Sequence, residues 1–159
     1  MLGPENAIWD DGEWVSWYEI NQQVKHREWR AKYPHADLSL LPIFESLLQT
    51  AEEYHLLTGR HLQVYGDIGE LYGAITHGIK LHRNYAQGSD GRLGNDFVEV
   101  KTITPFKNND WVTLNLAGHF SKVFMVKITE EFEVQSRLID RRSLPKPTGD
   151  TLRLQWPGT

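Results

Sequence analysis

Residues 97–104 carry the clearest strand pattern of the chain. Their β-branched and aromatic side chains lie between turn-forming residues, a composition typical of a β-strand. Because successive side chains of a strand point to opposite faces, Glu99 and Lys101 fall on the same face. That face also carries Phe97 and Ile103, and the opposite face carries Val98, Val100 and Thr102. A carboxylate and an ammonium group are therefore expected side by side in an otherwise apolar strand.

Helical spacing dominates the first half of the chain. Asp37 is placed to cap a helix whose apolar residues recur at helical intervals until about residue 59. A second helix is expected to begin at Asp67, because Asp67 and Glu70 have the spacing of a capping box. Gly78 is suited to end that helix.

The second half of the chain favours strands. Besides residues 97–104, strands are predicted at 79–85, 111–116, 122–128, 132–139 and 151–156. The run 122–128 is the most continuous apolar stretch, which is typical of a strand buried on both faces. The order of elements predicts one α/β (α+β) domain spanning residues 1–159, a mixed sheet of about five strands flanked by helices. Residues 1–60 are expected to be mainly helical, residues 61–144 to form the core, and residues 145–159 to form a loop and an edge strand.

Aromatic residues are concentrated near the N-terminus. Trp14, Trp17 and Tyr18 fall at positions i, i+3 and i+4, the spacing of one helical face. Packing of this face on the core is the first interpretation. The alternative is an exposed face that stacks on bases or binds a protein partner. Exposure of Trp9, Trp14 and Trp17 would favour the protein-binding alternative.

The composition is that of a globular protein. With 159 residues and 40% hydrophobic content, the chain is long enough to bury its own core. It contains no cysteine, which excludes disulfides and cysteine-based zinc sites and is compatible with a reducing compartment. No targeting pattern and no apolar stretch near the ~20 residues that span a bilayer is present. We therefore expect a cytoplasmic protein without a membrane partner.

The charges are unevenly distributed along the chain. Residues 1–78 contain 5 Lys and Arg against 12 Asp and Glu, whereas residues 79–146 contain 11 against 8. The basic half is the one that contains Glu99 and Lys101. Acidic helices beside a mixed sheet would produce this asymmetry, and a surface for a polyanion is the functional alternative.

A glycine-punctuated turn precedes Glu99. If residues 91–95 form a hairpin, the chain folds back and brings Asp90 to the Glu99 side of the sheet. Two carboxylates and Lys101 would then converge. The pattern of Asp90 followed by Glu99-Val100-Lys101 resembles the signature of the PD-(D/E)xK nuclease superfamily, in which an upstream helix often supplies a further Glu. Glu70 lies in a segment similar to that helix.

This resemblance covers residues 67–128 and extends to an uncharacterised bacterial domain family within the superfamily. One departure is Ser89, which stands where the motif has proline. The resemblance implies a restriction-endonuclease-like fold with a nuclease-like core in residues 61–144. It also implies a metal-dependent endonuclease that hydrolyses phosphodiester bonds with Mg²⁺ or Mn²⁺ as cofactor. The implied metal ligands are Asp90, Glu99 and Val100, and the implied catalytic residues are Asp90, Glu99, Lys101 and Glu70.

The residue types fit this chemistry. Phosphodiester cleavage needs charge neutralisation, an activated water and a stabilised leaving oxygen, which carboxylate-bound Mg²⁺ can supply. Lys101 would orient the attacking water or offset developing negative charge. The structural alternatives are an exposed ion pair for Glu99 and Lys101 and a capping role for Glu70. Asp96 is a rival to Asp90, but it falls on the strand face opposite Glu99.

The candidate nucleic-acid contacts are polar residues of the basic half: Lys80, Arg92, Lys107, His119 and Lys122. The expected partner is nucleic acid, DNA in the first place, with RNA left open. Because the chain has little room for a separate sequence-reading domain, we expect either modest specificity or a homodimer. The main alternative function is an inactive nuclease-like fold that binds nucleic acid or a protein.

Overall fold

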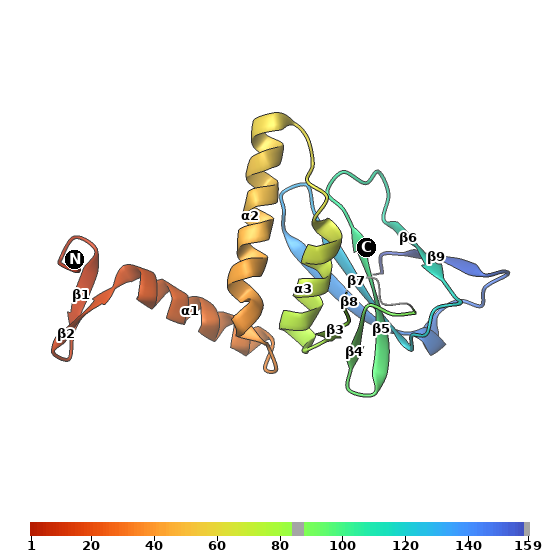
Figure 1. The fold of residues 1–159 in the computed structure, drawn as a ribbon, viewed down its shortest axis with the longest axis horizontal. Coiled ribbons are helices and arrows are strands. Elements are labelled where there is room, and N and C mark those ends of the chain that lie inside the picture. The colour runs from red at the N-terminus through yellow and green to blue at the C-terminus, as the bar shows by residue number, and fades with distance from the viewer. Residues whose placement is uncertain (84–87, 158–159) are drawn as a thin grey trace. The chain divides into compact units, whose positions relative to one another are not determined.

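The computed structural model describes residues 1–83 and 88–157, which form an α+β fold (Figure 1). The helices of this described part are α1 (Trp17–Lys32), α2 (Leu41–Thr58) and α3 (Tyr65–His77). Its strands are β1 (Ala7–Asp10), β2 (Glu13–Ser16), β3 (Lys80–Leu81), β4 (Gly91–Leu93), β5 (Asp96–Ile103), β6 (Trp111–Asn115), β7 (Lys122–Ile128), β8 (Val134–Asp140) and β9 (Thr151–Gln155). The chain divides into two compact units, residues 1–36 and residues 37–159.

The first unit consists of a β-hairpin followed by α1. Asp11 and Gly12 turn the chain between β1 and β2 with positive φ angles of 43° and 89°. Such left-handed turn residues match the twist of a two-residue hairpin. Trp14 therefore lies in β2, opposite Trp9, and the predicted single helical face through Trp14 and Trp17 is wrong. The helix begins only at Trp17, where the Ser16 hydroxyl accepts a hydrogen bond from the Glu19 N–H.

The second unit opens with two helices. Asp37 accepts a hydrogen bond from the Ser39 N–H at 3.1 Å and caps a 3₁₀ turn that leads into α2. Helix α3 begins at Tyr65 without a side-chain cap, so the predicted capping box of Asp67 and Glu70 is wrong. Gly78 ends this helix in the left-handed conformation, as predicted. None of the helices in the described part of the chain has the length and apolar character needed to cross a membrane.

The predicted mixed sheet of five strands is confirmed for the described residues. Its strand order is β3-β4-β5-β7-β8, with β5 and β7 parallel and the other pairs antiparallel. Strand β9 pairs with β6 in a separate two-stranded sheet. The strand predicted for residues 79–85 is limited to Lys80–Leu81, and residues 84 and 85 lie outside the described part.

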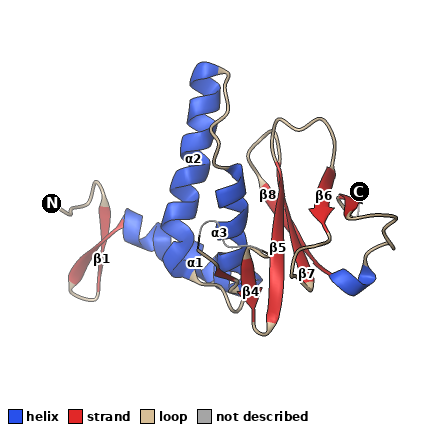
Figure 2. Cartoon of the chain, turned by 45° about the vertical axis from the view of Figure 1, so that its right-hand side comes forward, coloured by secondary structure: helices blue, strands red, loops and turns tan. Residues whose placement is uncertain are grey.

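Two layers enclose the central strands. Helix α3 lies close against one face, where Gly69 faces Thr102 of β5 and Gly73 faces Phe124 of β7. In Figure 2, α3 stands next to the strands and α2 stands on the side of α3 that faces away from them. The opposite face of the sheet packs with β6 and β9. The buried residues of that second layer are Ile103, Val112, Leu114, Phe120, Val123, Met125 and Trp156.

Candidate active site

Asp90 stands at the end of β4, where that strand stops pairing with β5. Its backbone is held on both sides, because its N–H donates to the Val98 carbonyl and its carbonyl accepts from the His82 N–H, each at 2.9 Å. Its carboxylate accepts a hydrogen bond from the Val100 N–H at 2.7 Å. The predicted hairpin therefore brings Asp90 to β5 as expected. The Asp90 carboxylate thus accepts the hydrogen bond from Val100 that the backbone of a longer β4 would otherwise accept.

Glu99 and Lys101 share one face of β5, as the alternation of the sequence predicts. The Lys101 ammonium lies 3.3 Å from a carboxylate oxygen of Glu99, and the two side chains are 33% and 21% exposed. Burial raises the pKa of Glu99, and the charge of Asp90 raises it further, against the opposing effect of Lys101. The pair is thus partly desolvated, unlike the fully exposed ion pair of the structural alternative.

Glu70 lies on α3, which packs against Thr102 on the face of β5 opposite Glu99 and Lys101. The pKa of Glu70 is raised from 4.5 to about 7, first by burial and then by the charges of Asp90, Asp67 and Glu99. The negative charges of both carboxylates of the predicted motif therefore act on Glu70, that of Asp90 more strongly than that of Glu99. Helix α3 can pack this close to β5 because Gly69 has no side chain to separate the helix from Thr102. The structure therefore brings Asp90, Glu99 and Lys101 together on β5, and Glu70 on α3 lies within reach of the charges of Asp90 and Glu99.

Asp90, Glu99 and Val100 offer oxygen ligands of the kind that a hard divalent cation binds. Asp90 and Glu99 supply carboxylates, and in a strand the Val100 carbonyl points to the same edge as the Val100 N–H that binds Asp90. Within residues 1–83 and 88–157, no three or more His, Cys, Asp or Glu side chains are arranged as a metal cluster. Mg²⁺ commonly takes only one or two carboxylates, so water and substrate phosphate would complete its coordination.

Two candidate nucleic-acid contacts lie together on the β3–β4 edge of the sheet. Lys80 and Arg92 are directly opposite each other in the strand register, and both are exposed. The Arg92 guanidinium donates to the Gly94 carbonyl at 2.7 Å, which fixes it beside the hairpin turn. This edge is continuous with Asp90, which immediately precedes β4.

The other three candidates are distributed elsewhere in the second unit. Lys107 donates to the Trp111 carbonyl, and Lys122 forms an ion pair of 2.6 Å with Asp140. His119 is exposed and lies beside Gly88, two residues before Asp90. Of these three, His119 is the one whose described contacts include the segment just before Asp90.

Asp96, the rival to Asp90, belongs to a different surface. Its carboxylate accepts a hydrogen bond from the Ser121 hydroxyl at 2.9 Å. It lines a pocket with Lys122, Asp140 and Arg142. Asp96 is therefore held on the Ser121 side of β5. Asp90, which accepts a hydrogen bond from Val100, is the carboxylate next to Glu99.

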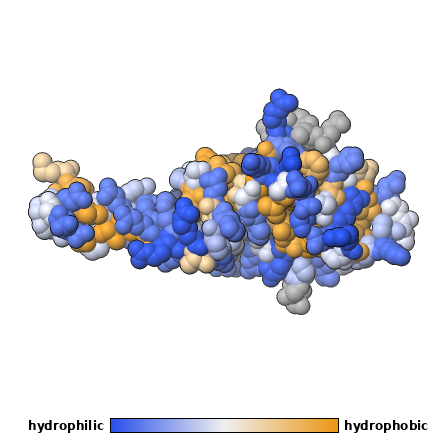
Figure 3. All heavy atoms as spheres, turned by 90° about the horizontal axis from the view of Figure 1, so that it is seen from below, coloured by the Kyte–Doolittle hydropathy of each residue, from blue (hydrophilic) through white to orange (hydrophobic). Residues whose placement is uncertain are grey.

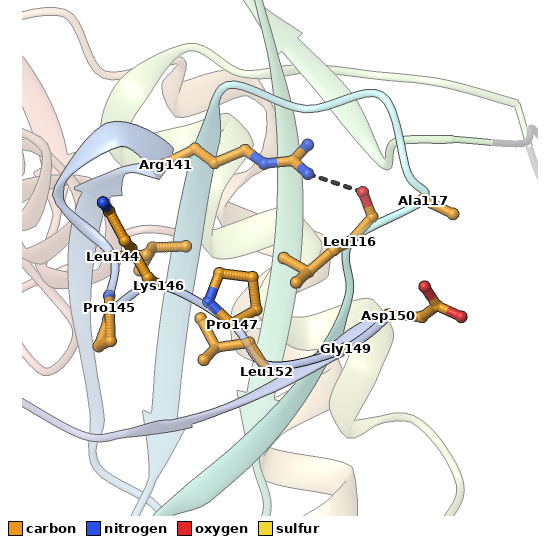
Figure 4. A pocket seen from close by; sticks show the side chains of 10 residues that line it. All are labelled: Leu116, Ala117, Arg141, Leu144, Pro145, Lys146, Pro147, Gly149, Asp150 and Leu152. Atoms are coloured by element: carbon orange, nitrogen blue, oxygen red, sulfur yellow. Dashed lines mark hydrogen bonds between the residues drawn. The ribbon is translucent and has the colours of Figure 1, made fainter.

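A separate pocket, lined by residues such as Leu116, Pro147 and Leu152, lies between the β6–β9 sheet and the loop before β9 (Figure 4). Arg141 points into it, and its guanidinium donates to the carbonyls of Leu116, Gly118 and Phe120 at 2.6, 3.0 and 3.1 Å. These bonds tie the β6–β7 connection to the end of β8. Arg141 is therefore a structural residue rather than a free phosphate contact.

Asp67 was predicted only as a helix cap, but in the structure it is an exposed residue of α3 one turn before Glu70. Its charge contributes to the raised pKa of Glu70. Asp67 and Glu70 are three residues apart on α3, and that spacing places them on one helical face. The sequence shows this spacing, but only the start of α3 at Tyr65 reveals that both residues lie inside the helix rather than at its cap.

No protein-family model matches this chain, and a comparison with curated proteins found no match. The likeness to the PD-(D/E)xK superfamily therefore depends on the motif residues and on their arrangement around β5.

Proposed function

We propose that this protein is a metal-dependent nuclease that hydrolyses phosphodiester bonds, with a restriction-endonuclease-like core. The observation that carries this proposal is the convergence of Asp90, Glu99 and Lys101 on β5, with Glu70 of α3 within reach of the charges of both carboxylates. Glu70 and Glu99 are partly buried beside the charge of Asp90, and the cost of ionising them is offset by Lys101 only at Glu99. A bound Mg²⁺ would lower that cost.

The proposed roles follow from the positions of the side chains. Asp90, Glu99 and the Val100 carbonyl would hold Mg²⁺, which when bound would neutralise phosphate charge and make water more acidic. Lys101, held against Glu99, offsets negative charge that develops on the phosphoryl oxygens. Glu70, with a pKa of about 7, is suited to accept a proton from the attacking water at neutral pH.

The test is cleavage of labelled single- and double-stranded DNA and RNA with Mg²⁺, Mn²⁺ or a chelator. The wild-type chain should cleave at least one substrate only with metal. Glu99→Gln should lower the rate by about 100-fold or more, because it removes a charge without changing the size of the side chain. Asp96→Asn is the matched control, since Asp96 lies on a different surface, and it should retain wild-type activity.

Equal activity of Glu99→Gln and the wild type would contradict the proposal, because cleavage would then come from another site or a contaminant. Binding of nucleic acid without metal-dependent cleavage would instead favour the alternative function, an inactive nuclease-like fold. The carboxylate of Asp90 already has a structural partner in the Val100 N–H, and this contact is compatible with that alternative.

A further inference from the structure

The first unit, residues 1–36, exposes an unusual amount of aromatic surface. Helix α1 contains no buried residue. Trp9, Trp14, Trp17 and Tyr18 are 60%, 36%, 48% and 72% exposed. Apolar residues of this unit reach the surface as orange spheres in Figure 3. Trp and Tyr dominate the energetics of protein interfaces, so a surface of this kind is typical of a contact between proteins.

Three exposed apolar residues form a stripe along α1. Trp17, Val24 and Ala31 are spaced by seven residues, which places them on one face of the helix. Trp17 and Ala31 are equally distant from Val24 along the chain. In an antiparallel pair of α1 helices centred on Val24, the large Trp17 of one copy therefore faces the small Ala31 of the other. A second copy of this chain thus complements the stripe in size.

The charges of the unit support the same arrangement. Residues 1–24 contain 5 Asp and Glu and no Lys or Arg, whereas the rest of α1 contains Lys25, Arg27, Arg30 and Lys32 against a single acidic residue, Glu28. An antiparallel pair brings the acidic half of one copy to the basic half of the other, and the twofold axis repeats this contact. A parallel pair would instead place like charges together.

The hairpin provides an independent indication of a cationic partner. Asp10 and Glu13 are directly opposite each other in the β1–β2 register, and both are exposed. Like charges directly opposite each other destabilise a two-stranded sheet. Lys and Arg side chains from a second molecule would relieve this repulsion, and the basic end of α1 can supply them.

We propose that residues 1–36 form a dimerisation element in which two copies of the chain pair their α1 helices antiparallel about Val24. The hairpin carboxylates of each copy then lie near Arg30 and Lys32 of the other. This inference does not depend on nuclease activity. The dimer would carry two copies of the acidic site on β5 in one particle.

The test is sedimentation velocity of the full chain over a concentration series. The wild type should show a concentration-dependent monomer–dimer equilibrium. Val24→Glu places one carboxylate from each copy at the twofold axis. It should raise the dissociation constant about tenfold or more, because residue 24 is at the centre of the interface and no positive charge lies opposite it there. Leu57→Glu is the matched control: Leu57 is 85% exposed on α2, outside the first unit, and its replacement should leave the dimer unchanged.

Charge reversal tests the partner and the orientation together. Asp10→Lys with Glu13→Lys should weaken association about tenfold, and so should Arg30→Glu with Lys32→Glu, because each pair replaces attraction with repulsion at both symmetric contacts. All four substitutions in one chain should restore association to near the wild-type value. Far-UV circular dichroism would verify that every variant is folded.

A monomeric wild type at every accessible concentration would overturn the proposal, and would leave a basic partner protein as the occupant of the surface. It would equally be overturned by a dimer that is insensitive to Val24→Glu. Failure of the fourfold variant to associate, while both double variants are folded and monomeric, would rule out the antiparallel arrangement.

Discussion

At the scale of single residues, Asp90 combines a structural contact with a charge, and two substitutions separate them. Asp90→Asn keeps an oxygen that can accept from the Val100 N–H, whereas Asp90→Ala leaves that donor without its partner. We expect Asp90→Ala to be less stable than Asp90→Asn by about 1–3 kcal/mol. Both variants should lose metal-dependent cleavage, since both lack the carboxylate. Urea denaturation and a cleavage assay measure the two effects, and equal stability of the variants would disprove the structural role.

Glu70 should make stability depend on pH in a defined window. Its pKa in the folded protein, about 7, is above its usual value of 4.5, so the folded state holds a proton that the unfolded state releases. The stabilising contribution of protonated Glu70 is therefore complete below pH 4.5 and is lost as the pH rises to about 7. Glu70→Gln should gain stability relative to the wild type across that interval.

The measurement is urea denaturation of both proteins, without metal, at several pH values between 4 and 8, which span the shifted pKa. Glu131→Gln, a change at an exposed turn residue, is the control and should run parallel to the wild type. A stability difference between Glu70→Gln and the wild type that stays constant with pH would show that Glu70 is not perturbed.

At the scale of elements, the approach of α3 to β5 determines whether Glu70 lies within reach of the charges of Asp90 and Glu99. A Cβ atom on Gly69 would lie 2.0 Å from the Thr102 hydroxyl oxygen, so Gly69→Ala forces the helix and the strand apart. We expect a loss of about 1–3 kcal/mol. Gly66→Ala, one turn earlier on α3 with open space around it, should instead be neutral or stabilising by about 0.5 kcal/mol.

Thermal and urea denaturation would compare the two glycine variants. Combining Gly69→Ala with Thr102→Ala should recover part of the loss, because the clashing hydroxyl is removed. Equal effects of Gly66→Ala and Gly69→Ala would mean that the close approach does not limit the packing of α3.

The elements predicted correctly are those whose own residues determine them. Strand β7 was predicted at its observed bounds because its apolar run suits only a buried strand. The N-terminal hairpin was missed, because the helical spacing of Trp14 and Trp17 concealed the turn signal of Asp11-Gly12. The start of α3 was misplaced because Tyr65 begins the helix without a cap, and tertiary packing sets that boundary.

At the scale of the whole molecule, the basic half of the chain places Lys80 and Arg92 on one edge of the sheet, beside Asp90. If nucleic acid binds there, Lys80→Gln should weaken binding for all sequences and reduce the salt dependence by about one charge. Arg137→Gln is the control, because β8 forms the opposite edge of the sheet. Fluorescence anisotropy at several salt concentrations measures the affinity and its salt dependence for both variants. Equal losses of affinity in Lys80→Gln and Arg137→Gln would contradict binding at the β3–β4 edge.

The candidate site was predictable only in part. The alternation of β5 placed Glu99 beside Lys101, and the glycine turn brought Asp90 to them. The position of Glu70 required the packing of α3, and the ion pair of Lys122 with Asp140 required the register of β7 and β8. Long-range contacts of this kind leave little trace in a single sequence.

We propose that Asp90 and Glu99 hold a catalytic divalent cation, and calorimetric titration with Mn²⁺ measures that binding. Wild-type protein, Glu99→Gln and Asp96→Asn would be compared at pH 7.5 with a nuclease-resistant oligonucleotide present, because substrate phosphate supplies part of the coordination of such ions. We expect saturable Mn²⁺ binding to the wild type and to Asp96→Asn, and its loss in Glu99→Gln. Binding that is absent from all three proteins, or equal in all three, would contradict the proposal.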